Sequence, residues 1–115
     1  MSRSVNINLQ LLEALVKLKQ QPRTTLLNIA DKSLVTAICE CALNLLNGNV
    51  TISPSQKNQL FKERRFIRSL ARSRVSWKTK RQLIARKAHV IPLIIDPAIK
   101  ALKNESCEEN GTHFA

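Results

Sequence analysis

Twelve lysine and arginine side chains lie within residues 57–87, accompanied by one acid, Glu63. Outside this stretch, seven basic residues are balanced by seven acids, so residues 57–87 account for the whole net charge of +11. Cations at this density bind phosphate groups through charge and hydrogen bonds, which makes a polyanion the first partner to consider. We call residues 57–87 the basic element. Its candidate nucleic-acid-binding residues are Lys57, Lys62, Arg64, Arg65, Arg68, Arg72, Arg74, Lys78, Lys80, Arg81, Arg86 and Lys87.

No arrangement of residues in the sequence predicts catalysis. The chain has no nucleophile beside a base, no paired carboxylates, no phosphate-cradling glycine loop and no HExxH motif. Cys39 and Cys41 flank Glu40 without a histidine nearby, and together with Cys107 they are predicted to be reduced thiols that fill space as small apolar residues. We therefore expect a protein that is not an enzyme and needs no metal or cofactor.

The composition predicts that helices position the cations. Hydrophobic residues make up 43% of the 115 residues, while two glycines and four prolines are few for a β-sandwich or barrel. We expect an all-α protein, a small bundle of about four to five helices in one domain over residues 1–103, with a disordered tail over 104–115. Helical patterns cover residues 8–20, 32–47, 53–73, 77–87 and 96–103, with a short helical turn over 24–30.

The helix over 32–47 is predicted to be the centre of the bundle. Asp31 can cap its start, Gly48 can end it, and apolar residues occupy most of its sides. Before the helix of the basic element, Ser53 and Gln56 have the spacing of a capping box, with Pro54 between them. These signals place the two helices in sequence with a short connection.

The helix over 53–73 is expected to carry one core face and one cationic face. Leu60, Phe66, Ile67, Leu70 and Ala71 fall in one arc of the helical projection. Most of the cations fall opposite, Phe61 sits among them, and Glu63 and Arg74 enter the apolar arc.

A second basic helix should follow at once. Ser76 can cap it, and the two helices form a basic helical hairpin with a continuous positive surface. Base reading is weakly supported, because the turn lacks glycine and Gln82 is the one amide available for adenine. Trp77 is interpreted as a packing anchor rather than a stacking platform. We expect binding to double-stranded DNA without sequence preference, with log K falling against log salt at a slope of about −5.

Three segments resemble a known family. They are residues 38–50 (ICECALNLLNGNV), 53–57 (SPSQK) and 70–87 (LARSRVSWKTKRQLIARK). Together they resemble a small basic protein of Polinton (Maverick) elements and adintoviruses, which has been likened to adenovirus core protein X, or mu. The resemblance implies a DNA-condensing structural protein of a virus or virus-like transposon, located in the host nucleus and virion, with capsid proteins as further partners. Ten of the cations match the family's basic stretch: Lys57, Arg64, Arg65, Arg68, Arg72, Arg74, Lys78, Lys80, Arg81 and Lys87. The family's QKGG sequence is replaced here by residues 86–89 (RKAH), which puts proteolytic processing at this point in doubt.

Other functions remain open at this stage. The apolar segment over 90–102 beside a cationic helix could make a membrane-active or partner-binding capsid accessory protein, although packing in the core is favoured. An RNA-binding protein and a regulator of helix-turn-helix type are further alternatives, in the nucleus or the cytoplasm. Residues 5–16 mix polar residues into their apolar ones, so a secreted protein is not expected.

Overall fold

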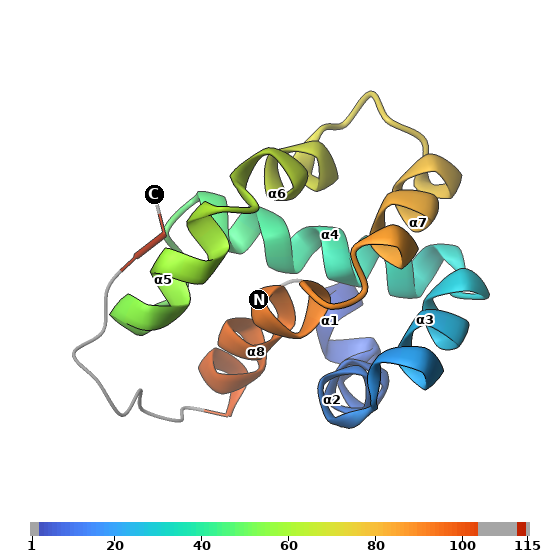
Figure 1. The fold of residues 1–115 in the computed structure, drawn as a ribbon, viewed down its shortest axis with the longest axis horizontal. Coiled ribbons are helices and arrows are strands. Elements are labelled where there is room, and N and C mark those ends of the chain that lie inside the picture. The colour runs from blue at the N-terminus through green and yellow to red at the C-terminus, as the bar shows by residue number, and fades with distance from the viewer. Residues whose placement is uncertain (1–2, 104–112, 115) are drawn as a thin grey trace.

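The computed structural model describes residues 3–103 and 113–114, and all of their regular elements are α-helices (Figure 1). The all-α prediction is confirmed, but the described residues form eight helices rather than four to five. The helix expected over 53–73 is divided in two, the turn over 24–30 is a full helix, and an additional helix precedes residue 8. The helices are α1 (Arg3–Ile7), α2 (Leu9–Lys17), α3 (Gln20–Asn28), α4 (Lys32–Leu46), α5 (Pro54–Phe61), α6 (Arg64–Ala71), α7 (Trp77–Arg86) and α8 (Ile91–Leu102).

Helix α4 is the centre of the bundle, as its apolar sequence predicts. Asp31 caps it by accepting a hydrogen bond from the amide of Leu34 at 2.9 Å. Gly48 follows its C-terminus with a φ of 69°, a left-handed conformation that favours glycine. Helices α1, α6, α7 and α8 all pack against α4 (Figure 1). The elements that carry the cations therefore rest directly on the core helix.

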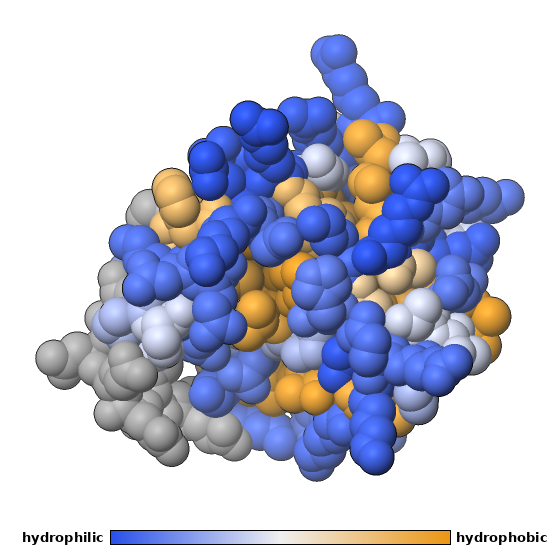
Figure 2. All heavy atoms as spheres, viewed as in Figure 1, coloured by the Kyte–Doolittle hydropathy of each residue, from blue (hydrophilic) through white to orange (hydrophobic). Residues whose placement is uncertain are grey.

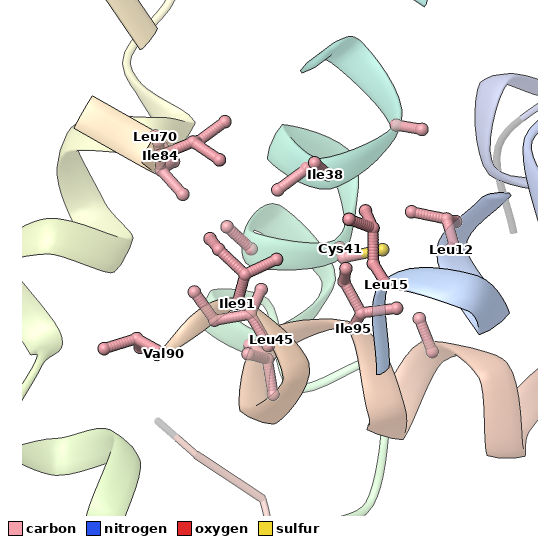
Figure 3. Packing of buried hydrophobic residues seen from close by; sticks show 14 of the residues in the cluster. Leu12, Leu15, Ile38, Cys41, Leu45, Leu70, Ile84, Val90, Ile91 and Ile95 are labelled. Atoms are coloured by element: carbon pink, nitrogen blue, oxygen red, sulfur yellow. The ribbon is translucent and has the colours of Figure 1, made fainter. Parts of the chain in front are cut away.

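The core is made of aliphatic side chains from α2, α4 and α8. Leu12 and Leu15 of α2, Ile38 and Cys41 of α4, and Ile95 of α8 all point into this core (Figure 3). Each of these five side chains is fully buried. Such burial stabilises the folded state by roughly 1.5–3 kcal/mol for each large aliphatic side chain.

Helix α8 begins earlier than expected. Asp96 was predicted to start it, but the helix already begins at Ile91, and Pro97 lies inside it. Asp96 instead accepts a hydrogen bond from Gln56 of α5 at 3.3 Å and pairs with Lys100 at 3.2 Å. The apolar side chains of residues 90–102 face the core, so membrane contact through them would require α8 to leave the bundle. Within the described residues, every helix is too short or too polar to span a bilayer.

The helix expected over 53–73 is divided into α5 and α6. Its start is as predicted, since Ser53 and Gln56 form both hydrogen bonds of the capping box. The break falls at residues 62–63, and the second helix ends at Ala71. One continuous helix would carry Glu63 and Arg74 into the apolar arc, at a high desolvation cost. The break turns Glu63 toward Lys87, and the early end leaves Arg74 in an exposed loop.

The N-terminal segment is also divided. The helix expected over 8–20 is α2, which ends at Lys17, and an additional helix, α1, precedes it. Asn8 separates the two, and its side chain donates to the hydroxyl of Ser33 at 2.9 Å. Leu12 is buried, whereas Leu11 is 44% exposed. The expected turn over 24–30 is a full helix, α3, with Pro22 in its first turn, where a missing amide hydrogen is tolerated.

The predicted disordered tail, residues 104–115, lies mostly outside the described residues. Two of its residues are described. Phe114 is 8% exposed and belongs to the core cluster, and the Nδ1 atom of His113 lies 3.1 Å from the carbonyl oxygen of Val50. These two residues contact the chain just after α4.

Candidate nucleic-acid interface

The basic element forms α5, α6, α7 and the turns between them. Seven of its twelve cations are exposed to solvent, and five are half-buried. The exposed ones stand on α6, on α7 and in the connections that precede and join them. They are Lys62, Arg65, Arg68, Arg72, Arg74, Lys78 and Arg86.

Few carboxylates neutralise the positive charge of this surface. In the described part of the chain, the ion pair of the basic element joins Lys87 to Glu63 at 3.1 Å. Two other ion pairs, Lys100–Asp96 and Lys103–Glu13, involve α8. The seven exposed cations make no ion pair within the described residues. Their charge is therefore free to attract an external polyanion.

Two half-buried arginines are held over aromatic rings. The guanidinium of Arg64 lies 4.4 Å from the ring centre of Phe61, and its Nη1 donates to the Phe61 carbonyl at 3.0 Å. The guanidinium of Arg81 lies 5.1 Å from the ring centre of Trp77 and donates to the carbonyl of Ala30 at 3.3 Å. These contacts fix two cations in place without neutralising them.

Helices α6 and α7 both pack on α4 and also contact each other. Leu70 anchors α6 and Ile84 anchors α7, and both side chains are buried against the core that α4 organises (Figure 3). Helix α7 packs on α3 as well. The loop over 72–76 bridges the two helices as they stand apart over α4 (Figure 1). The result is two basic ridges with apolar atoms showing between them (Figure 2).

A groove of about 350 Å³ lies between these ridges, and we call it the α6–α7 groove. Trp77 stands at its α7 side and is partly exposed. Lys32 and Lys80 contribute two cations to the lining, and Glu40 contributes one acid. The remaining lining residues are Val35, Thr36, Cys39, Leu43, Leu70, Ala71 and Val75, which give it a largely apolar floor.

The thiols near the groove are unreactive at neutral pH. Burial raises the pKa of Cys39 to about 11, against a smaller opposing effect of Lys80, and burial raises that of Cys41 to about 12. Both are free thiols. No three His, Cys, Asp or Glu residues within the described ranges gather to hold a metal ion.

A second hollow, of about 420 Å³, opens at the break between α5 and α6. Lys62, Arg64, Arg65 and Lys87 line it together with Glu63. Because Glu63 binds Lys87 instead of capping α6, no side chain accepts a hydrogen bond at the start of that helix. This hollow extends the positive surface of α6 toward the end of α7.

The sequence identified the cations but missed their spatial arrangement. Phe61 already stood out, because the helical projection placed it among charges, and it is 54% exposed. The α6–α7 groove gave no comparable signal, since it depends on how far apart α6 and α7 lie on α4. Trp77 was interpreted as a packing anchor, and the structure places it both against the core cluster and in the groove.

Comparison with known proteins adds no relative. No family model, curated protein sequence or solved structure matches the chain.

Proposed function

We propose that the protein binds nucleic acid through the phosphate backbone, with double-stranded DNA as its main ligand, and condenses it as a structural protein. The observation that carries this proposal is the set of seven exposed cations on α6, α7 and their connections, which lack carboxylate partners in the described residues. Ordinary protein surfaces intersperse both signs of charge. A surface that does not do so repels itself until a polyanion supplies counter-charge.

The geometry supports binding without sequence preference. The exposed side chains of the ridges are mainly arginine and lysine on short helices, and they suit phosphate contacts. Base reading in the major groove needs a recognition helix that presents several base-specific side chains. On α7, Gln82 is the exposed amide available for such a contact. Affinity would then come from the release of counterions condensed on the DNA.

The proposal is tested by measuring DNA affinity against salt. A labelled duplex is titrated with the full chain at several ionic strengths, and binding is followed by fluorescence anisotropy. If most of the seven exposed cations contact phosphates, log K falls against log salt with a slope of about −5 to −6. Duplexes of different sequence should give the same affinity. A slope near zero, or strong preference for one sequence, would overturn the proposal.

A triple variant locates the interface on α6. Arg65→Gln, Arg68→Gln and Arg72→Gln remove three exposed cations, and the slope should become shallower by roughly 2–3 units.

The matched control removes the same charge elsewhere. Arg3→Gln, Lys17→Gln and Lys19→Gln also remove three exposed cations, from the N-terminal helices and their connection. This control should keep the parent slope. Equal slopes in the two triple variants would show that net charge, and not the basic element, governs binding.

The biological setting of this activity is a further part of the proposal. The three segments that resemble the small basic protein of Polinton elements and adintoviruses contain α4 from Ile38 onward, the start of α5 and all of α7. A role in condensing packaged DNA, in the nucleus and the virion, follows from that resemblance.

A further inference from the structure

We propose that the α6–α7 groove holds an unpaired nucleobase against Trp77, so that single-stranded nucleic acid makes a contact that duplex DNA cannot make. This inference rests on the proposed function and extends it to a second class of ligand. In a duplex the bases are paired and stacked, and they cannot enter a groove of this kind. In a single strand each base can turn outward while its phosphates remain on the cations.

The lining of the groove suits the flat face of a base. Trp77 is partly exposed there, and Val35, Leu43 and Val75 supply apolar surface around it. Aromatic side chains provide stacking surfaces that accept every base, because each base has a π-face. A small polar ligand would gain little binding free energy from such an apolar floor, because hydrogen bonds there would not offset the cost of its desolvation.

The charges around the groove suit the phosphates on either side of that base. Lys32 and Lys80 line the groove itself, and Arg72 and Lys78 are exposed on the loop and helix that border it. The guanidinium of Arg81 and the ammonium of Lys78 lie 5.1 Å and 6.0 Å from the Trp77 ring centre. An unpaired base entering here is flanked by cations from α4, from α7 and from the loop between α6 and α7, so phosphates on both sides of the base can be contacted.

The acid in the groove is compatible with this ligand. Glu40 is outnumbered by Lys32 and Lys80, so the lining keeps a positive charge. A carboxylate can also accept a hydrogen bond from the exocyclic amino group of cytosine.

The experiment uses Trp77 as its own reporter, since the chain contains one tryptophan and no tyrosine. The full chain is titrated with single-stranded oligothymidine of about 16 nucleotides, the upper end of the usual site size. An abasic strand of the same length and a duplex of the same length serve as matched ligands. Anisotropy of a label on each ligand reports binding, and tryptophan emission reports entry into the groove. We expect all three to bind and only oligothymidine to quench Trp77 strongly.

Variants separate stacking from packing. Trp77→Ala should weaken oligothymidine binding by roughly 5- to 150-fold, the range of one base–aromatic stack, and should change duplex binding little. Trp77→Phe should recover most of the loss. Because Trp77 also contacts the core cluster, Thr36→Phe provides an independent variant that fills the groove and keeps the reporter. It should abolish the quenching selectively.

The possible failures are distinguishable. If oligothymidine binds but quenches Trp77 no more than the abasic strand does, the inference is wrong and the proposed function stands. If Thr36→Phe leaves the quenching unchanged, the base does not enter the groove and the inference is again wrong. If none of the three ligands binds, the proposed function fails and this inference fails with it.

Discussion

Arg23 is a buried cation that serves the fold, and replacing it tests the packing between α2 and α3. Its side chain is 9% exposed. The Nε atom donates to the carbonyl of Leu15 at 2.8 Å, and Nη2 donates to the carbonyl of Leu18. Nη1 donates to the side-chain oxygen of Gln20 at 3.2 Å. The guanidinium thus caps the C-terminal end of α2, where carbonyls lack helical partners and the helix dipole favours a cation.

The magnitude follows from these bonds. Two hydrogen bonds from a charged donor to backbone carbonyls contribute about 3–6 kcal/mol together, and fixing the arginine rotamers costs about 2 kcal/mol. We therefore expect Arg23→Met to lower the free energy of unfolding by about 1–4 kcal/mol. Arg23→Lys should lose less, because an ammonium keeps its charge but lacks the planar fork that reaches both carbonyls.

The assay is urea unfolding followed by circular dichroism of the helices. With a urea dependence of about 2 kcal/mol per molar, the midpoint should fall by roughly 0.5–2 M in Arg23→Met. Lys19→Met is the matched control, since Lys19 is an exposed cation just before α3, and its midpoint should barely change. Equal midpoints for the two variants would refute the capping argument. The salt slope of DNA binding should remain that of the parent in both.

Two further predictions concern charge and pH. Glu63→Gln frees Lys87 from its ion pair at 3.1 Å, so the salt slope of DNA binding should steepen by up to about 1. The control Glu13→Gln breaks the ion pair with Lys103 and should leave the salt slope unchanged. If both variants give the same slope, Lys87 does not reach a phosphate. Burial raises the pKa of Cys39 from about 9 to about 11 and that of Cys41 from about 9 to about 12. The contribution of the two buried thiols to the free energy of unfolding is therefore complete below pH 9. It is lost as the pH rises toward their pKa values in the folded state. Urea unfolding should show that the free energy of unfolding falls by about 1 kcal/mol per thiol between pH 9 and 10. If a Cys39→Ser, Cys41→Ala variant loses as much over the same pH range, the loss does not come from the thiols.

Local signals predicted the helix starts well. Asp31, Ser53 and Ser76 each cap a helix as expected, because a cap depends on a few neighbouring residues. Gly48 ends α4 for the same local reason. The central position of α4 was also predictable, since apolar residues occupy most of its sides.

The divisions of the helices depend on distant contacts and were missed. The break before α6 requires Lys87 to receive Glu63, and the break at Asn8 requires Ser33. Pro97 resembles a helix start in sequence, but tertiary packing of the apolar residues around it keeps α8 continuous. The candidate cations were predictable from composition, whereas the α6–α7 groove needed the placement of two helices on a third.

The separate anchoring of α6 and α7 on α4 has a consequence for how the protein responds to its medium. Burial of Leu70 and Ile84 holds two positively charged ridges near each other. The free energy of this burial must offset the electrostatic repulsion between the cations of α6 and those of α7. Added salt screens that repulsion and stabilises the free chain, while the same salt weakens its attachment to DNA. At low salt the free chain is less stable, because the repulsion between the ridges is stronger, and DNA binds more tightly. DNA binding therefore stabilises the folded chain most under the conditions in which the free chain is least stable.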